Sequence, residues 1–254
     1  MKKVNNKIKR GQITVFIIIA IVVVVLIGII LIITKNNFNT NNTNDESYNY
    51  VRDCLRQTGE QALYYIGDMG GYYHNPLEST DYGIPYYFYL NKNIMPSKGS
   101  VENETSMFID NRGVLCGYFD DPQVSVISKG KVSTKTKIYD DKVVIDVKYP
   151  ITIEKANKKI SYENFNIEIP GRVGILYKAT EEYMQGQVNN PGGICISCIN
   201  DIANKYDVKF VTYNYDNETV IFNLYDNNTK INNQSFYVYT FAVKYDLNVE
   251  NVSI

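Results

Sequence analysis

The longest apolar run in the sequence extends from Ile13 to Ile33, and only Thr14 and Gly28 interrupt it. Built as a helix with a rise of about 1.5 Å per residue, this run spans roughly 31 Å, which matches the hydrocarbon thickness of a bilayer. The run also lacks the polar face that an amphipathic helix of a globular domain shows. The pattern therefore predicts a transmembrane helix over residues 13–34.

Apolar residues recur at spacings of three and four in several later segments, which is typical of amphipathic helices. The first of these segments follows Asp45 or Ser47, either of which can cap a helix, and it stops at Gly70-Gly71. Further helices are expected from near Ser100 to Cys116, from Pro170 to Val188, and from Cys195 to Tyr206.

Between residues 123 and 169 the apolar period changes to two, which predicts an antiparallel meander with one face in solvent. Segments rich in Tyr, Phe and Val predict further strands at residues 84–90, 208–213, 219–225 and 236–243. Helices therefore precede strands twice along the chain. This order indicates an α+β fold in which helices pack on antiparallel sheets.

The composition divides the chain into four parts. Residues 1–12 are a basic N-terminus, residues 13–34 the transmembrane helix, and residues 35–46 an Asn-rich polar tether without an apolar period. Residues 47–254 form the α+β domain. Its two halves, about 47–169 and 170–254, are candidate subdomains because each contains helices followed by strands.

The charges are divided unevenly along the chain. The first 34 residues carry five cations and no acid, a charge of +5, whereas the rest carries 21 basic and 27 acidic residues, a charge of −6. Cations before the span place the N-terminus in the cytoplasm and residues 35–254 outside the cell membrane. The partner that this predicts is a lipid bilayer, while the acidic domain argues against nucleic acid.

The segment Arg10-Gly11-Gln12-Ile13-Thr14-Val15-Phe16 before the apolar run resembles the class III signal peptide of archaeal pilin-like proteins. The resemblance implies cleavage between Gly11 and Gln12, with the apolar helix retained on a pilin-like surface subunit. That family usually carries Glu where this chain has Phe16, and its helix continues into the head domain. The run also lacks the A-x-A site of a secretory signal peptide, so an uncleaved anchor is the favoured hypothesis.

The segment outside the membrane resembles a group of single-pass, membrane-anchored archaeal proteins without an established activity. The residues that carry the resemblance are Tyr50-Val51-x-x-Cys54-Leu55, Gly70-Gly71-Tyr72, Ile84-Pro85-Tyr86-Tyr87, Pro96-Ser97, Cys116, Tyr149-Pro150 and Ile169-Pro170. The resemblance implies a location and an architecture, and it implies no chemistry.

Four cysteines in an exported domain form an even set with three possible pairings. Cys195-Ile196-Ser197-Cys198 places a CxxC at a helix start, where a thiolate is stabilised, so both cysteines are candidate catalytic residues of a thiol-disulfide oxidoreductase. The favoured interpretation is structural, with a Cys195–Cys198 disulfide and a Cys54–Cys116 disulfide. The second bond closes a loop of about 60 residues and contributes roughly 4 kcal/mol to stability.

Other chemistry has little support in the sequence. A zinc site needs four ligands at matched spacing, and His74 is the only imidazole, so we expect no metal and no cofactor. His74 is either a candidate base or, more simply, an exposed turn residue. The chain contains no nucleophile elbow, Walker loop or HExxH motif, which leaves hydrolase and nucleotide chemistry unsupported.

Two features suggest a surface role. The 23 tyrosines, as in Phe236-Tyr237-Val238-Tyr239, form either a glycan- or protein-binding face or ordinary strand packing. Six glycosylation sequons start at Asn41, Asn103, Asn217, Asn227, Asn233 and Asn251. The leading hypothesis is a membrane-anchored extracytoplasmic structural or interaction protein, not an enzyme, whose partners include other surface proteins or glycans.

Overall fold

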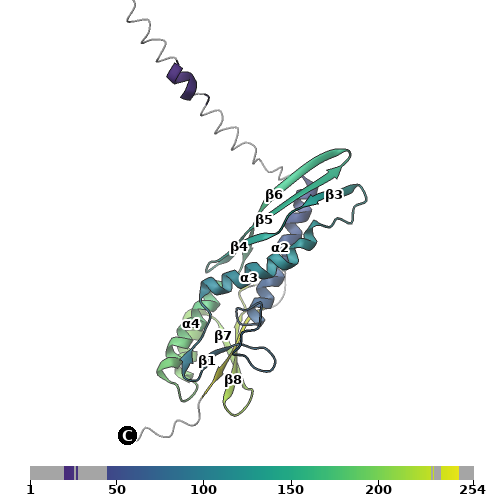
Figure 1. Cartoon of the computed structure of the whole chain (residues 1–254). Helices are drawn as coiled ribbons and strands as arrows, with labels where there is room; N and C mark the ends of the chain where they lie inside the picture. The colour runs from purple at the N-terminus through teal and green to yellow at the C-terminus, as the bar shows by residue number, and fades with distance from the viewer. Residues whose placement is uncertain (1–19, 26, 28–44, 230, 232–235, 246–254) are drawn as a thin grey trace, which may run out of the picture. The chain divides into compact units, whose positions relative to one another are not determined.

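The computed structural model describes residues 20–25, 27, 45–229, 231 and 236–245 (Figure 1). The chain divides into two compact units, Met1–Asp45 and Glu46–Ile254. Residues 20–25 and 27 of the first unit are helical. No helix in the described part of the chain is long and apolar enough to cross a membrane. Most of the predicted span 13–34, the tether residues 35–44, and Gly11, Gln12, Asn41, Asn233 and Asn251 lie outside the described residues.

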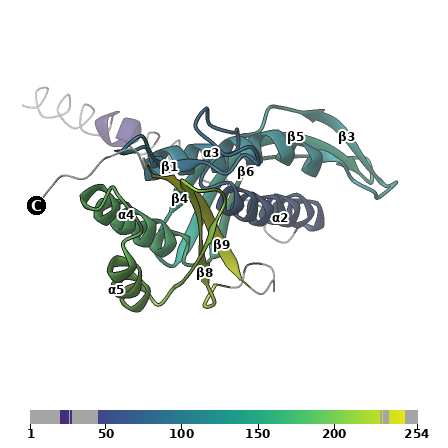
Figure 2. The same cartoon turned by 90° about the horizontal axis from the view of Figure 1, so that it is seen from below.

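The second unit is α+β, as predicted, with helices packed on antiparallel sheets. Its helices are α2 (Glu46–Asp68), α3 (Lys98–Arg112), the short 3₁₀ helix η1 (Gly113–Gly117), α4 (Val173–Asn189) and α5 (Ile196–Tyr206). Helix α2 is followed by Gly70 and Gly71 in left-handed conformations, with φ of +51° and +85°, which only glycine adopts without strain. Helix α4 packs against α5 (Figure 2).

The first sheet is built around one long strand. Its strands are β3 (Val124–Lys129), β4 (Ser133–Ile138), β5 (Lys142–Lys155) and β6 (Lys158–Pro170). Strand β6 follows one edge of β5, while β4 and then β3 pair with successive parts of its other edge. Pro150 lies where β5 changes from β4 to β3 and where its register with β6 shifts, a position that tolerates a residue without an N–H.

The second sheet has the strand order β2-β1-β9-β8-β7. Its members are β1 (Tyr86–Tyr89), β2 (Lys92–Asn93), β7 (Lys209–Asn214), β8 (Thr219–Asp226) and β9 (Tyr237–Lys244), and only β1 and β9 pair in parallel. Both of the segments proposed as subdomains, 47–169 and 170–254, contribute strands to this sheet. Buried side chains from both sheets also belong to one hydrophobic cluster.

Helix α2 contacts both sheets, and two glycines make the close approach possible. A Cβ atom on Gly59 would lie 2.7 Å from Cδ1 of Ile145 in the first sheet. One on Gly67, two turns later, would lie 2.4 Å from the carbonyl oxygen of Val238 in the second sheet. The glycine pair therefore lets one helix pack directly on both sheets.

The prediction that the third helix begins at Pro170 was wrong. Pro170 is the last residue of β6, where it pairs with Lys142, and α4 begins at Val173. A proline at the end of a strand interrupts no later pairing, and the next donor, the Gly171 N–H, bonds to the carbonyl of Asp141 at 2.9 Å. The proline therefore ends a strand and does not open the helix.

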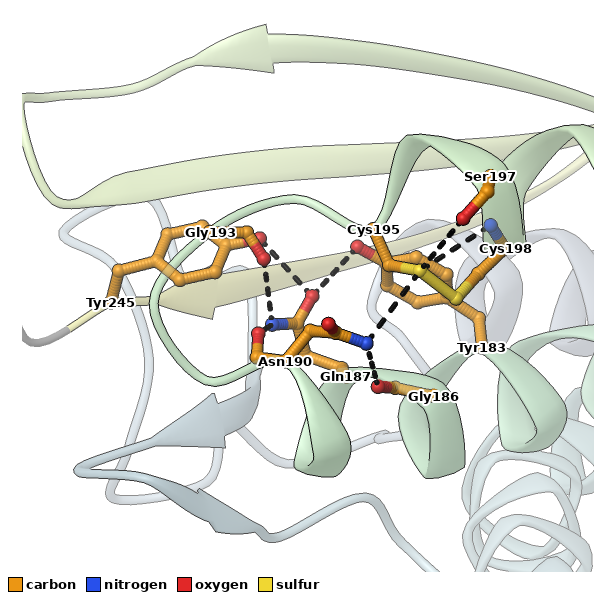
Figure 3. Close-up of a disulfide and its surroundings, with 9 residues drawn as sticks. All are labelled: Tyr183, Gly186, Gln187, Asn190, Gly193, Cys195, Ser197, Cys198 and Tyr245. Atoms are coloured by element: carbon orange, nitrogen blue, oxygen red, sulfur yellow. Dashed lines mark hydrogen bonds between the residues drawn. A yellow bond between two sulfur atoms is a disulfide. The ribbon is translucent and has the colours of Figure 1, made fainter. Parts of the chain in front are cut away.

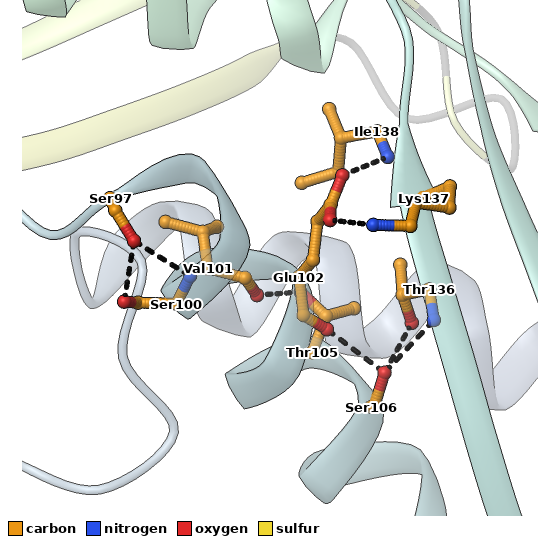
Figure 4. A network of polar contacts seen from close by, with 9 residues as sticks. All are labelled: Ser97, Ser100, Val101, Glu102, Thr105, Ser106, Thr136, Lys137 and Ile138. Atoms are coloured by element: carbon orange, nitrogen blue, oxygen red, sulfur yellow. Dashed lines mark hydrogen bonds and ion pairs between the residues drawn. The ribbon is translucent and has the colours of Figure 1, made fainter.

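Side chains of α3 hydrogen-bond to the outer edge of β4 (Figure 4). The Ser106 Oγ accepts from the Thr136 N–H at 3.0 Å, and the Glu102 carboxylate accepts from the Ile138 N–H at 3.0 Å. Asp110 lies beside Thr134, the next outward residue of the strand. The contacting residues recur every four positions on α3, a rise of about 6.0 Å, and every two positions on β4, a rise of about 6.6 Å. The two series therefore stay aligned along the helix and the strand. The helix thus satisfies an edge that would otherwise lack partners.

Candidate functional site

The CxxC segment lies at the corner between α4 and α5 (Figure 3). Pro191-Gly192-Gly193 follows the end of α4, and α5 begins at Ile196 with Cys195 as its N-cap. The sulfurs of Cys195 and Cys198 are bonded, with their Cα atoms 5.2 Å apart. The Sγ of Cys195 accepts a hydrogen bond from the backbone N–H of Cys198 at 3.3 Å, which is the position of a helix-capping acceptor.

Neutral polar groups surround the sulfur of Cys195. The Asn190 side-chain amide donates to it at 3.8 Å, and the Ser197 hydroxyl lies 3.6 Å away. Cys198 packs instead against α4, where a Cβ atom on Gly186 would lie 2.9 Å from its sulfur. Cys195 is 9% exposed and Cys198 is partly buried, so solvent reaches the bond only to a limited degree.

Gln187 holds the loop that precedes the disulfide. Its side chain is fully buried, and its amide donates to the carbonyls of Asn190 at 2.6 Å and Gly193 at 3.0 Å. Its amide oxygen accepts from the hydroxyls of Tyr183 at 2.9 Å and Tyr245 at 3.2 Å (Figure 3). Sequence reasoning missed Gln187; the available signal was its i+4 spacing from Tyr183 on one helix.

Burial keeps both hydroxyl donors protonated. Desolvation raises the pKa of Tyr183 well above its ordinary value of 10.0, and it raises the pKa of Tyr245 to about 12. Neutral tyrosines donate to the Gln187 oxygen over the whole physiological range. The hydrogen bonds described at this corner are therefore all between uncharged groups.

This arrangement permits two chemical roles. The Cys195–Cys198 disulfide fixes the first turn of α5, which packs on α4 through Cys198. After a two-electron reduction, a thiolate at Cys195 would receive the Cys198 N–H, the Asn190 amide and the positive end of the α5 dipole, all of which favour the ionised form. The geometry is thus compatible with a brace or with a nucleophilic thiolate.

The other two cysteines form a bond inside the domain. Cys54 on α2 is joined to Cys116 of η1, with Cα atoms 5.5 Å apart and a sequence separation of 62. Cys116 is 1% exposed, and the Thr58 hydroxyl lies 3.7 Å from its sulfur. This disulfide ties α2 to η1, which follows α3, and its Cys54 side is partly buried.

The remaining sequence candidates are spread over the domain. His74 is an exposed residue whose Nδ1 lies 3.8 Å from a carboxylate oxygen of Glu104. Within the part of the chain that the structure describes, no three His, Cys, Asp or Glu residues are grouped as metal ligands. Of the sequons described, Asn103, Asn217 and Asn227 are exposed.

The tyrosines of β9 face the core and not a partner. Tyr237 and Tyr239 are each 1% exposed, and the Tyr239 hydroxyl bonds to that of Tyr87 at 2.9 Å. Only Phe236, just before the strand, is strongly exposed. The alternating pattern of this segment therefore reflects ordinary packing of a sheet against helices.

One open hollow was missed by sequence reasoning. It lies between η1 and β3 and is lined by residues that include Gly117, Tyr118, Phe119, Ile127 and Lys129. The Lys129 ammonium lies 3.5 Å from the centre of the Tyr118 ring, and its proximity lowers the pKa of that phenol. The contact is a solvent-exposed cation–π pair.

Comparisons with protein-family models, with curated proteins and with solved structures found no match to this chain.

Proposed function

We propose that this chain is a membrane-anchored extracytoplasmic protein with a structural or interaction role at the cell surface. The observation that carries the proposal is the pairing of all four cysteines in two disulfides within the unit 46–254. Disulfides of this kind persist in oxidising compartments and are rare in the cytosol. The apolar run Ile13–Ile33, with five cations before it and only Lys35 directly after it, supports an anchor whose C-terminal side is outside.

A structural or interaction role is supported by the character of the two bonds. One disulfide joins the partly buried Cys54 of α2 to the buried Cys116 of η1, and the hydrogen-bond partners described for the other are neutral. The first bond cross-links α2 and η1, and the second fixes the first turn of α5. The lipid bilayer is the partner that an anchored domain meets first. Other surface proteins or glycans are the class of partner that an anchored domain would meet.

The anchor can be tested by extraction of membranes at alkaline pH, which releases peripheral proteins and retains those that span the bilayer. The full chain should stay in the membrane pellet. A variant with Val22→Lys and Val24→Lys should be released, because each lysine near the centre of a span costs about 2.5–3.5 kcal/mol. Release of the unaltered chain would contradict the anchor.

The leader distinguishes the anchor from a pilin-like subunit. An uncleaved anchor retains its basic N-terminal residues, including Lys7 and Arg10. Intact-mass spectrometry of the protein from native membranes should therefore show a chain that contains residues 1–12, apart from loss of the first methionine. A mature chain that starts at Gln12 would instead support processing after Gly11 and a pilin-like surface subunit.

A thiol-disulfide oxidoreductase is the second candidate function, and the capping position of Cys195 favours it. In that reaction a substrate dithiol would be oxidised to a disulfide while Cys195–Cys198 accepts two electrons and two protons. A glutathione titration with mapping of each bond separates the two roles. Structural bonds of exported proteins have potentials below about −300 mV, whereas catalytic ones lie between roughly −270 and −120 mV. A Cys195–Cys198 potential within the catalytic range, with Cys195 alone alkylated at pH 6, would support the oxidoreductase.

A further inference from the structure

The outer edges of the two sheets are protected in different ways. On β4, Ser106 and Glu102 of α3 accept the outward N–H groups. Strand β2 has only two residues, and β3 has a register shift between Val126 and Ser128 that interrupts a regular edge. The exposed side chains of β6 include the charged residues Lys158, Lys159, Glu163 and Glu168. Each of these devices is known to prevent one sheet edge from pairing with another.

Among the residues that the structure describes, none of these devices protects strand β7. It pairs with β8 without a register shift from Lys209 to Asn214, contains no proline, and carries a single charge at its first residue. Thr212 and Tyr213 are exposed, and Phe210 and Val211 are partly buried. A six-residue, regular and mostly uncharged edge strand is a template for a further strand.

The hydrogen bonds around β8 show which groups of β7 point outward. The Tyr215 N–H donates to the Thr219 carbonyl at 2.9 Å, and the Tyr245 N–H donates to the Glu218 carbonyl at 2.8 Å. Because backbone groups alternate along an antiparallel strand, the N–H and C=O groups of the odd-numbered residues of β8 point toward β7. Those of its even-numbered residues point toward β9. On β7 the backbone groups of Lys209, Val211 and Tyr213 therefore face β8. Those of Phe210, Thr212 and Asn214 face the open edge.

We propose that β7 pairs with β7 of a second copy of this chain, antiparallel, about a two-fold axis at Thr212. In this register Thr212 lies opposite Thr212 of the second copy, and Phe210 opposite its Asn214. All three outward-facing residues thus meet outward-facing residues, as an isologous interface requires. The two five-stranded sheets become one continuous sheet of both copies.

The side chains of β7 are complementary to themselves in this register. Val211 lies opposite Tyr213 of the second copy, and the two central threonines face each other. Both β-branched–aromatic and Thr–Thr pairs are favourable across antiparallel strands. Lys209 lies beside the turn that contains Asp216 of the second copy, so the only charge of the strand meets the opposite sign. The pairing involves only the unit 46–254 and does not depend on a membrane location.

Disulfide trapping tests the register directly in the full chain in detergent. Because the four native cysteines are paired, Thr212→Cys introduces one free thiol. Directly opposite residues of this type have Cα atoms about 5.5 Å apart, within the range of a disulfide. Thr212→Cys should therefore give a covalent dimer on mild oxidation. Asn214→Cys is the matched control, because four residues of offset separate its two copies by about 13 Å.

A second variant tests the pairing without a cross-link. Thr212→Pro removes an outward N–H that β8 does not use, so the domain should keep its fold and its melting behaviour. Light scattering of the detergent-solubilised full chain should give a dimer for the unaltered protein and a monomer for Thr212→Pro. Equal cross-linking of both cysteine variants, a monomeric unaltered chain, or a folded Thr212→Pro variant that remains dimeric would each overturn the proposal.

Discussion

At the scale of single residues, the glycines of α2 matter more than its helix propensity. Gly59 and Gly67 stand where the helix backbone approaches a sheet, so a methyl group on either would meet protein atoms at less than 3 Å. Gly192, in the loop before the CxxC, has no atom within 4 Å of the same position and no positive φ. The same amino acid therefore has a packing role in one place and none in the other.

We expect Gly67→Ala to lower the free energy of unfolding by about 1–3 kcal/mol, the usual cost of overpacking. The new methyl group would press on the Val238 carbonyl, which is backbone and cannot rotate away. Gly192→Ala is the control and should be neutral or stabilising by less than about 1 kcal/mol. Urea unfolding of both variants measures the difference, and equal stabilities would refute the proposed contact.

The two disulfides should also differ in how much they contribute to the stability of the domain. In the chain-entropy model a loop of about 60 residues contributes roughly 4 kcal/mol, and a loop of four residues roughly 2 kcal/mol. The double variant Cys54→Ala/Cys116→Ala should therefore unfold at a lower temperature than Cys195→Ser/Cys198→Ser. Calorimetry in the absence of reductant makes the comparison. A larger loss from the CxxC pair would show that the α4–α5 corner, and not the loop, dominates stability.

At the scale of elements, the hydrogen-bonded contact between α3 and β4 explains how an edge strand is covered by a helix. Glu102 is 8% exposed, and its carboxylate accepts from both the Ile138 N–H and the Lys137 ammonium, the latter at 2.7 Å. Burial raises the pKa of Asp110, which lies one turn of α3 after Ser106 and beside Thr134. The polar residues of α3 thus replace a missing neighbouring strand.

Removal of the central acceptor should destabilise this contact. Ser106→Ala leaves the buried Thr136 N–H without its partner, which costs about 1–3 kcal/mol. Ser100→Ala, an exposed position of the same helix, is the matched control and should cost less than about 1 kcal/mol. Urea titrations report both values, and hydrogen exchange at Thr136 should accelerate only in the first variant. An unchanged exchange rate there would contradict the role of Ser106.

Sequence patterns predicted the local elements well and their assembly poorly. The helix that ends before Gly70-Gly71 and the alternating strands between residues 123 and 169 follow from period and turn residues. The parallel pairing of β1 with β9 joins residues about 155 positions apart, and no local pattern encodes such a partner. Likewise, Glu102 and Ser106 of α3 accept from backbone groups of β4, and Gln187 accepts from the distant Tyr245 hydroxyl. Such residues look like ordinary polar helix positions until the fold is known.

At the scale of the whole molecule, buried tyrosines make the core sensitive to alkali. Burial raises the pKa of Tyr177 and Tyr245 to about 12 and raises that of Tyr87 and Tyr237 well above 10. An unfolded tyrosine titrates near 10. The unfolded state therefore loses these protons first, and the stability that they provide is complete below pH 10 and is lost as the pH rises toward 12 and above.

The free energy of unfolding should accordingly fall above pH 10, by about 1.4 kcal/mol per pH unit for each such tyrosine. Tyr245→Phe removes one of them while the Tyr183 hydroxyl still reaches Gln187. This variant should show a shallower slope between pH 10 and 12 in urea titrations. A stability that is constant from pH 8 to pH 11 would contradict the burial of these hydroxyls.

The proposed topology, an anchored chain whose domain lies outside the cell, is the premise of the proposed function. Its most direct test is the reaction of single cysteines with a membrane-impermeant maleimide on intact cells that express the full chain. Gly192→Cys, in an open loop of the domain, should be labelled without lysis, and Asn5→Cys, before the apolar run, only after permeabilisation. Labelling of Asn5→Cys on intact cells, with Gly192→Cys protected until lysis, would contradict the proposed topology.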